Sequence, residues 1–175
     1  DTIDGAAVEK LIRPDFICES LRPSNLVTVL DDQFLKVERP GTVSLSQSSN
    51  EQSPKNEEPS LTGAVGLAKA MRAMVEPFSG ATNVRFEAKI FRVVAQEGDV
   101  LTRQYFSISG QTKSGMIEQH ATWDIGWVRN DNNSESDGGD ALPRMRWLRV
   151  EEFEQTVSRQ PSGPLFADCT ESVLG

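Results

Sequence analysis

The sequence predicts an α+β domain in which a curved antiparallel sheet of four long strands, extended by a short hairpin, wraps around about three helices. Two observations predict this fold class. Apolar residues recur at helical spacing in stretches before residue 83, and they alternate with period two in the runs that follow. The connections between most of those runs are short and rich in glycine and polar residues, which is typical of antiparallel neighbours.

The first 40 residues contain two predicted helices and a predicted hairpin. Residues 4–22 show a helical apolar pattern that is interrupted at Pro14, so we expect two short helices there. Residues 26–30 and 34–38 are β-type runs on either side of an Asp-Asp pair, which predicts a hairpin.

A loop and a third helix are predicted next. Residues 41–59 are rich in Ser, Gln, Asn, Glu and Pro, and they bury too little apolar surface to offset the entropy of ordering, so we expect a mobile loop. Ser60 is a suitable N-cap for a helix whose apolar positions run from Leu61 to Val75, and Pro77 with Gly80 would end it.

The four long strands are predicted at residues 83–95, 99–109, 115–130 and 143–150. A helix is expected to follow around Phe153. The acidic loop between the last two strands lacks the Gly and Glu that an EF-hand calcium loop requires, because Ser136 and Leu142 occupy those positions. We therefore interpret this loop as a solvated turn.

His120 is the only histidine of the chain and lies in a predicted strand. Alternation places Gln119, Trp123 and Trp127 on one face of that strand and Glu118 with His120 on the other. The apolar face must pack against the helices, so His120 is expected to point away from the interior. Without a second histidine, a nucleophile motif or a cysteine cluster, we expect no catalytic residue, no metal site and no cofactor. A pair of carboxylates stays open as an alternative, because Asp and Glu are numerous.

The order of these elements resembles the nuclear transport factor 2-like fold, the cystatin-like cone shared with SnoaL-like proteins. The resemblance covers roughly residues 5–150 and rests on element order and strand length. It implies a sheet that curves around the helices and leaves a pocket at the open end of the cone. Enzymes of this family typically place an Asp or His within the pocket, and we match no such residue here.

Five residues form the candidate ligand pocket. Trp123 and Trp127 could form one wall, and Gln119 on the same face could orient a small apolar ligand. Tyr105 and Arg103 share one face of the neighbouring strand, and alternation does not decide whether that face is inward. Packing of all five in the core or at its rim is the alternative interpretation.

Several strands carry large apolar residues on both faces, which predicts a covered outer surface. Phe91 and Val93 would oppose Ile90 by alternation, and with Glu118 and His120 they form the candidate interface. A homodimer through the outer sheet face is our first hypothesis, and docking of a following domain of the same protein is the second. A bulge that shifts the register would remove part of the patch.

The last residues change character after a linker rich in Pro and Gly. Phe166, Asp168 and Thr170 have a Phe-x-Asp-x-Thr spacing that resembles the strand opening FG-GAP repeat propellers in bacterial ASPIC/UnbV-type proteins. Residues 1–159 would then be the cone, and residues 160–175 a linker with the start of a following domain. A frayed terminus is the alternative.

Composition and charge limit the classes of partner and the cellular compartments that we expect for this protein. The net charge is −8 and no cluster of Lys and Arg occurs, which disfavours nucleic acid. No apolar run approaches the ~20 residues that cross a bilayer, so we expect no membrane insertion. The propeller resemblance implies an exported or periplasmic protein, and a cytoplasmic location stays open. Cys18 and Cys169 would be two buried thiols or, after export, one disulfide.

Three hypotheses about function follow. The first is a non-catalytic accessory or small-ligand-binding module of a larger propeller-containing protein. The second is a SnoaL-like enzyme that acts on a small hydrophobic substrate by proton transfer, and the third is a dimerisation scaffold. Ligand contacts to Trp123 or Trp127 would favour binding, whereas loss of turnover on changing an inward carboxylate would establish an enzyme.

Overall fold

The computed structural model describes residues 5–41, 60–95, 99–128 and 142–159 of the chain. Most of the predicted loop at 41–59, the acidic turn and the tail from residue 160 lie outside the described residues, and so does Cys169. The predictions for those segments stay predictions.

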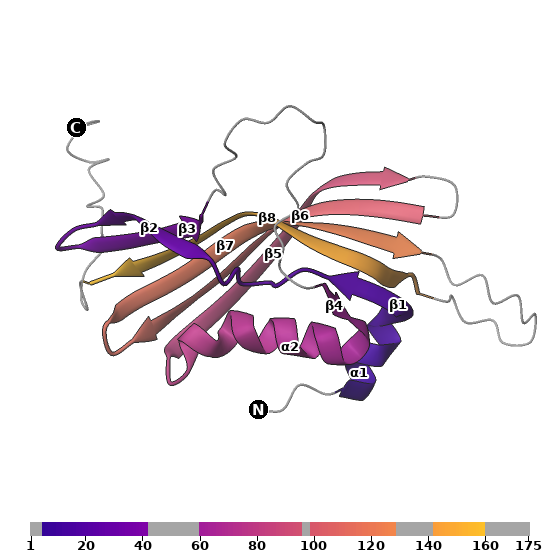
Figure 1. Ribbon diagram of the computed structural model, residues 1–175, viewed down its shortest axis with the longest axis horizontal. Coiled ribbons are helices and arrows are strands. Elements are labelled where there is room, and N and C mark those ends of the chain that lie inside the picture. The colour runs from indigo at the N-terminus through magenta and orange to yellow at the C-terminus, as the bar shows by residue number, and fades with distance from the viewer. Residues whose placement is uncertain (1–4, 42–59, 96–98, 129–141, 160–175) are drawn as a thin grey trace, which may run out of the picture.

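The described residues form a sheet-dominated α+β structure, which confirms the predicted class at that level (Figure 1). Eight strands form one sheet in the order β2-β3-β8-β7-β6-β5, with β1 paired to β8 and β4 paired to β1. In chain order the elements are α1 (Gly5–Leu11), β1 (Ile12–Cys18), β2 (Leu26–Asp31), β3 (Leu35–Pro40), β4 (Leu61–Thr62), α2 (Gly63–Val75), a 3₁₀ turn (Glu76–Phe78), β5 (Thr82–Ala95), β6 (Asp99–Thr112), β7 (Gly115–Val128) and β8 (Arg144–Ser158).

The predicted second helix is wrong, because residues 12–18 form strand β1. Phe16 and Cys18 are buried while Ile17 is exposed, which is the alternation of a strand. β1 runs parallel to β8, and its register shifts between Ile12 and Ile17, around Pro14. Among the described residues there are therefore two α-helices and one 3₁₀ turn rather than about three helices. Burial raises the pKa of the Cys18 thiol to about 11.

The predicted hairpin and third helix are confirmed, and the start of the helix is corrected. Asp32 closes the β2–β3 turn, where its Oδ1 accepts from the backbone N–H groups of Phe34 at 2.7 Å and Leu35 at 2.8 Å. These bonds lower the pKa of the Asp32 carboxyl. Helix α2 begins after Thr62, not after Ser60, because the short strand β4 intervenes.

The last strand is longer than predicted, continuing to Ser158, and no helix forms around Phe153. Between the pairs His120–Glu154 and Thr122–Glu151 the register shifts, so β8 carries an extra residue relative to β7. Glu152 has a φ of 53° at this bulge. The bulge interrupts the period-two pattern and lets Phe153 become a buried core residue on a continuing strand.

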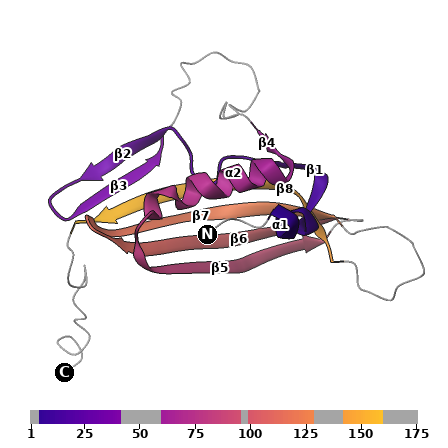
Figure 2. The same cartoon turned by 90° about the horizontal axis from the view of Figure 1, so that it is seen from below.

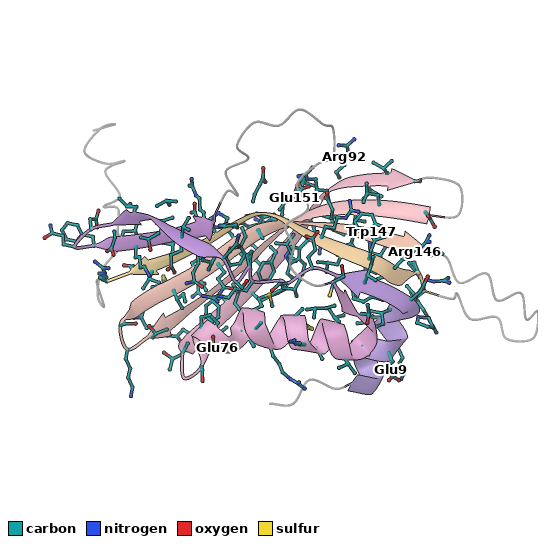
Figure 3. All side chains as sticks on the ribbon, in the orientation of Figure 1. Glu9, Glu76, Arg92, Arg146, Trp147 and Glu151 are labelled. Carbon is teal, nitrogen blue, oxygen red and sulfur yellow. The ribbon has the colours of Figure 1, made fainter. Side chains whose placement is uncertain are left out.

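The two faces of the sheet differ in what covers them. We call the face that packs against α2 the inner face; Phe106, Ile125 and Leu148 are buried on it, against Leu67 and Met74 of the helix. Seen from the helix side, α2 runs along the β7–β8 side of the sheet and β5 forms the opposite edge (Figure 2). On the other, outer face, Arg92 and Glu151 project away from the helices (Figure 3).

A bulge in β5 changes the predicted face of one residue. Ile90 lies opposite Gln104 and Val93 lies opposite Thr102, with a register shift between Ile90 and Arg92. Cross-strand partners share a face, so Val93 lies on the inner face with Ile90 rather than opposite to it.

Among the described residues no helix is long and apolar enough to cross a membrane.

Candidate functional site

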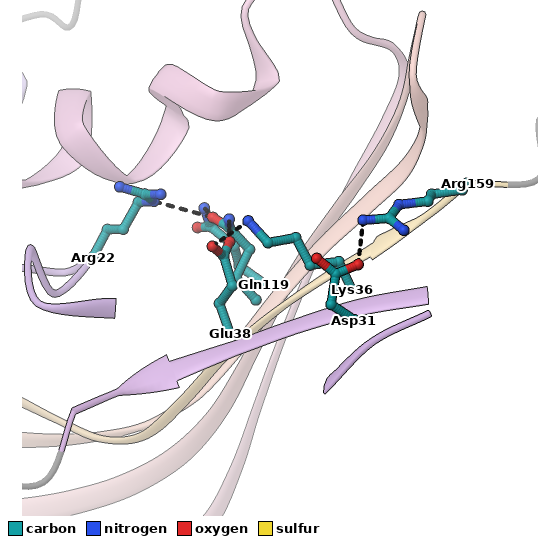
Figure 4. A network of polar contacts seen from close by, with 7 residues as sticks. Arg22, Asp31, Lys36, Glu38, Gln119 and Arg159 are labelled. Carbon is teal, nitrogen blue, oxygen red and sulfur yellow. Dashed lines mark hydrogen bonds and ion pairs between the residues drawn. The ribbon is translucent and has the colours of Figure 1, made fainter. Parts of the chain in front are cut away.

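Five polar side chains converge on the inner face and form what we call the inner polar cluster: Arg22, Lys36, Glu38, Gln119 and Gln155 (Figure 4). Gln119 donates through Nε2 to Gln155 Oε1 at 3.0 Å, and Gln155 donates through Nε2 to Glu38 Oε2 at 2.7 Å. Arg22 Nε donates to Gln155 Oε1 at 3.1 Å, and Lys36 Nζ lies 2.6 Å from Glu38 Oε1.

Strand register brings these residues together. Gln155 of β8 lies between Gln119 of β7 and Glu38 of β3, directly opposite both. Lys36 lies two residues from Glu38 and therefore on the same face of β3. Arg22 reaches the cluster from the segment after β1. The cluster is thus a row across three neighbouring strands, completed by one arginine.

The hydrogen bonds fix the orientation of both amides. A carboxylate only accepts, so Gln155 must turn its amide nitrogen toward Glu38 and its oxygen toward Gln119. Gln119 must then turn its own nitrogen toward Gln155. Its Oε1 atom is left buried, and no donor of the described residues reaches it. A buried acceptor left without any donor costs about 1–3 kcal/mol, so this oxygen is an acceptor still open to a donor from outside the described residues.

A cleft of about 390 Å³ lies next to the cluster. Ile117 and Val157 form part of its wall, and these two residues oppose each other on β7 and β8. The next inward pair along the same strands is Gln119 with Gln155. The cleft is lined by Pro77, Ser79, Gly80, Thr112, Lys113, Ser114, Ile117 and Val157.

The two tryptophans of the predicted pocket lie on the inner face but not at this cleft. Trp123 stacks on Phe106 with ring centroids 4.3 Å apart, and its buried Nε1 has no acceptor among the described residues. Trp127 donates through Nε1 to Thr102 Oγ1 at 2.8 Å and borders a second cleft, of about 220 Å³, at the other end of the strands. The structure therefore separates Gln119 from Trp127.

Tyr105 and Arg103 lie on the outer face, which corrects their assignment to a shared pocket with Gln119. Tyr105 pairs with Thr122 across the sheet, and Arg103 pairs with Asp124. Arg103 Nε lies 3.6 Å from Asp124 Oδ1, and its guanidinium also pairs with Glu151. These are polar contacts on the outer face.

His120 lies on the outer face as the alternation predicts. Its ring stacks on Tyr105 with centroids 6.1 Å apart, and Nε2 lies 3.8 Å from Glu154 Oε1. Glu154 also accepts from Arg39 at 2.6 Å. Glu118 accepts from Ser107 at 3.4 Å on the same face. No group of three or more His, Cys, Asp or Glu side chains in the described part of the chain is placed to hold a metal ion.

Sequence reasoning identifies Gln119 and misses the other four members of the inner polar cluster. The spacing of Lys36 and Glu38 predicts that they share a face, but not that this face is inward. Gln155 is missed because the pattern around Phe153 predicts a helix there. Arg22 lies outside any regular element, so no periodicity identifies it.

The sequence matches no protein-family model, and no curated protein matches it. Among solved structures, Aln2 from a Streptomyces species is similar with a TM-score of 0.41 and 22% identity, over 54% of this chain and 62% of that one. A conserved protein from Planctomyces limnophilus is similar with a TM-score of 0.45 and 10% identity, over 89% and 83% of the two chains. At these scores the likeness assigns neither a fold family nor a function.

Proposed function

We propose that this chain is a nuclear transport factor 2-like cone domain that binds a small molecule on the inner face of its sheet, next to the inner polar cluster. The observation that carries the proposal is Gln119 Oε1, a fully buried acceptor without a donor among the described residues. A long antiparallel sheet with α2 along one face, and with the β2–β3 hairpin beside the last strand, supports the cone.

The chemistry of the cluster indicates the kind of ligand. Gln119 Oε1 requires an O–H or N–H donor, while Ile117 and Val157 offer apolar contact beside it. The cluster holds two cations, Arg22 and Lys36, and one carboxylate, Glu38, and each of the three is already hydrogen-bonded within it. A small, largely apolar molecule that carries one hydroxyl or amide group fits these demands better than an ion.

A SnoaL-like enzyme is the second candidate, and Glu38 is the observation that favours it. This carboxylate is the inward acid that the sequence alone does not identify. Each of its oxygens accepts one bond in the cluster, and a carboxylate oxygen can accept a second from a substrate. Turnover that is lost in Glu38→Gln, with ligand binding retained, would support proton transfer by Glu38.

The larger context belongs to the same proposal. The Phe-x-Asp-x-Thr spacing at the end of the chain supports an accessory role beside a following propeller in an exported protein. The full-length gene product tests this directly: a propeller that follows Gly175 is the expected result, and an unrelated continuation contradicts it.

Binding can be tested with small aromatic alcohols and amides, phenol and benzamide among them, added to isotope-labelled protein. We expect the side-chain amide signals of Gln119 and Gln155 to shift, together with the backbone signals of Ile117 and Val157. Gln119→Leu removes the open acceptor and should weaken binding about fivefold, since a lost hydrogen bond in a buried site costs on the order of 1 kcal/mol.

His120→Ala is the matched control, because it changes the neighbouring residue of the same strand on the opposite face. It should leave the dissociation constants of the probes unchanged. Probes that shift only outer-face signals, or that bind Gln119→Leu as well as the original chain, would contradict the proposal.

A further inference from the structure

β5 is an edge strand of the sheet, and among the described residues no strand pairs with its outer side. Among the described residues its 14 positions pair on one side only, with β6. Phe86, Ile90 and Val93 lie on its inner face and keep 61%, 58% and 62% of their surface exposed. A long edge strand with exposed apolar side chains is a template for another strand.

The helices leave this edge uncovered. α2 runs along the β7–β8 side of the sheet, and β5 lies beyond it (Figure 2). The outer face is a weaker candidate for a partner, because Arg103, Asp124, His120 and Glu154 there already interact with one another or with neighbouring side chains. The β5 edge, with its exposed apolar side chains, is therefore the stronger candidate for a partner.

The sequence of β5 is complementary to itself. Residues 86–90 are Phe-Glu-Ala-Lys-Ile. On either side of Ala88, the acidic Glu87 is balanced by the basic Lys89, and the apolar Phe86 is balanced by the apolar Ile90. Glu87 and Lys89 lie on the outer face, where their side chains are 2.8 Å apart within one chain. Phe86 and Ile90 lie on the inner face.

We propose that two copies of this chain pair antiparallel through β5, with Ala88 opposite Ala88 of the second copy, so that two sheets become one. In this register Glu87 faces Lys89 of the second copy, Phe86 faces its Ile90, and each pair occurs twice. Centring the pairing one residue away would place Glu87 opposite Glu87, or Lys89 opposite Lys89, and like charges directly opposite are destabilising.

Pairing through β5 alone gives a closed dimer. The register with β6 is unbroken from Arg85 to Ile90, and it shifts on both sides of that segment. Such irregularities twist an edge away and restrict pairing to the segment between them. Two β5 edges that pair with each other leave no free β5, so the symmetry is closed.

Charge reversal in the full chain tests the partner and the register together. Sedimentation equilibrium at micromolar concentrations should show a dimer whose dissociation constant rises roughly tenfold in Lys89→Glu and in Glu87→Lys, because each single change creates two like-charge pairs. The double variant E87K/K89E restores opposite charges and should recover the original dissociation constant. Lys113→Glu, an equal change of charge in the exposed β6–β7 turn, should have no effect.

A disulfide across the two-fold axis tests the register independently. In a Cys169→Ser background, Ala88→Cys should form a disulfide-linked dimer on mild oxidation, because directly opposed residues have Cα atoms within bonding range. Ala73→Cys, at another exposed alanine, on α2, should stay monomeric under the same conditions. A strict monomer, or a dimer indifferent to the charge reversals, overturns the proposal; a charge-sensitive dimer without the Ala88→Cys disulfide overturns this register.

Discussion

Gly126 lies on the outer face directly beneath the indole ring of Trp147. A Cβ atom at position 126 would lie 2.3 Å from Nε1 and 2.4 Å from Cε2 of that ring. The ring is rigid, and the guanidinium of Arg149 lies over it, 5.1 Å from the ring centroid. The local sequence Ile-Gly-Trp therefore needs its glycine for a close approach between two strands rather than for an unusual backbone angle.

Gly126→Ala should lower the free energy of unfolding by about 1–3 kcal/mol, the range for an added methyl group in a packed site. Urea denaturation measures it. The same substitution in a Trp147→Leu background should cost much less, since the rigid ring is then absent, and the double-mutant cycle isolates this contact. Equal costs in both backgrounds would show that the ring is not the obstacle.

Among the elements, β1 is a short apolar segment that the sequence pattern predicts as a helix and the structure shows as a strand. In a strand Phe16 and Ile17 point to opposite sides, and here Phe16 is fully buried while Ile17 is 48% exposed. The strand also gives α2 a surface to pack on, because β1 contacts both the helix and β8.

Phe16→Ala should cost about 3–5 kcal/mol of unfolding free energy, as for a large aromatic removed from a core. Ile17→Ala should cost less than about 1 kcal/mol, because roughly half of its surface is already in water. Thermal or urea unfolding measures the loss of unfolding free energy in each variant, and the loss in Phe16→Ala should be several times larger than that in Ile17→Ala. Similar losses at both positions would contradict the strand.

At the scale of the whole molecule, stability should fall from the centre of the sheet to its edges. β7 is hydrogen-bonded to β6 on one side and β8 on the other along most of its length, whereas β2 and β5 lie at the two ends of the strand order. Backbone amides that face a partner strand exchange only when that pairing opens.

Hydrogen exchange followed by NMR should therefore find the slowest amides in β7. In a dilute, monomeric sample, alternate amides of β5 should exchange quickly, because every second N–H of an edge strand points away from its one partner. The intervening β5 amides, which face β6, serve as the internal control. Uniform protection along β5 at high dilution would mean that its outer edge is covered within one chain.

Local features of the fold can be predicted from the sequence alone. Period-two alternation from residue 83 predicts the long strands, and the runs around the Asp-Asp pair predict the β2–β3 hairpin. Alternation also places His120 on the other face of the strand from Gln119 and the tryptophans, as observed. These inferences hold because side-chain direction in a regular strand depends only on neighbouring backbone geometry.

Features that depend on a partner strand could not be predicted, because they arise only when the strands pair. Which face of β6 is inward, and so the outer position of Tyr105 and Arg103, follows from register with β7. Two bulges depend on how neighbouring strands pair. One lies in β5 and moves Val93 to the inner face, and the other lies in β8, which continues past Glu152. The inner polar cluster joins Arg22 to Gln155, and no local pattern relates residues so distant in sequence, because their proximity arises only when the sheet assembles.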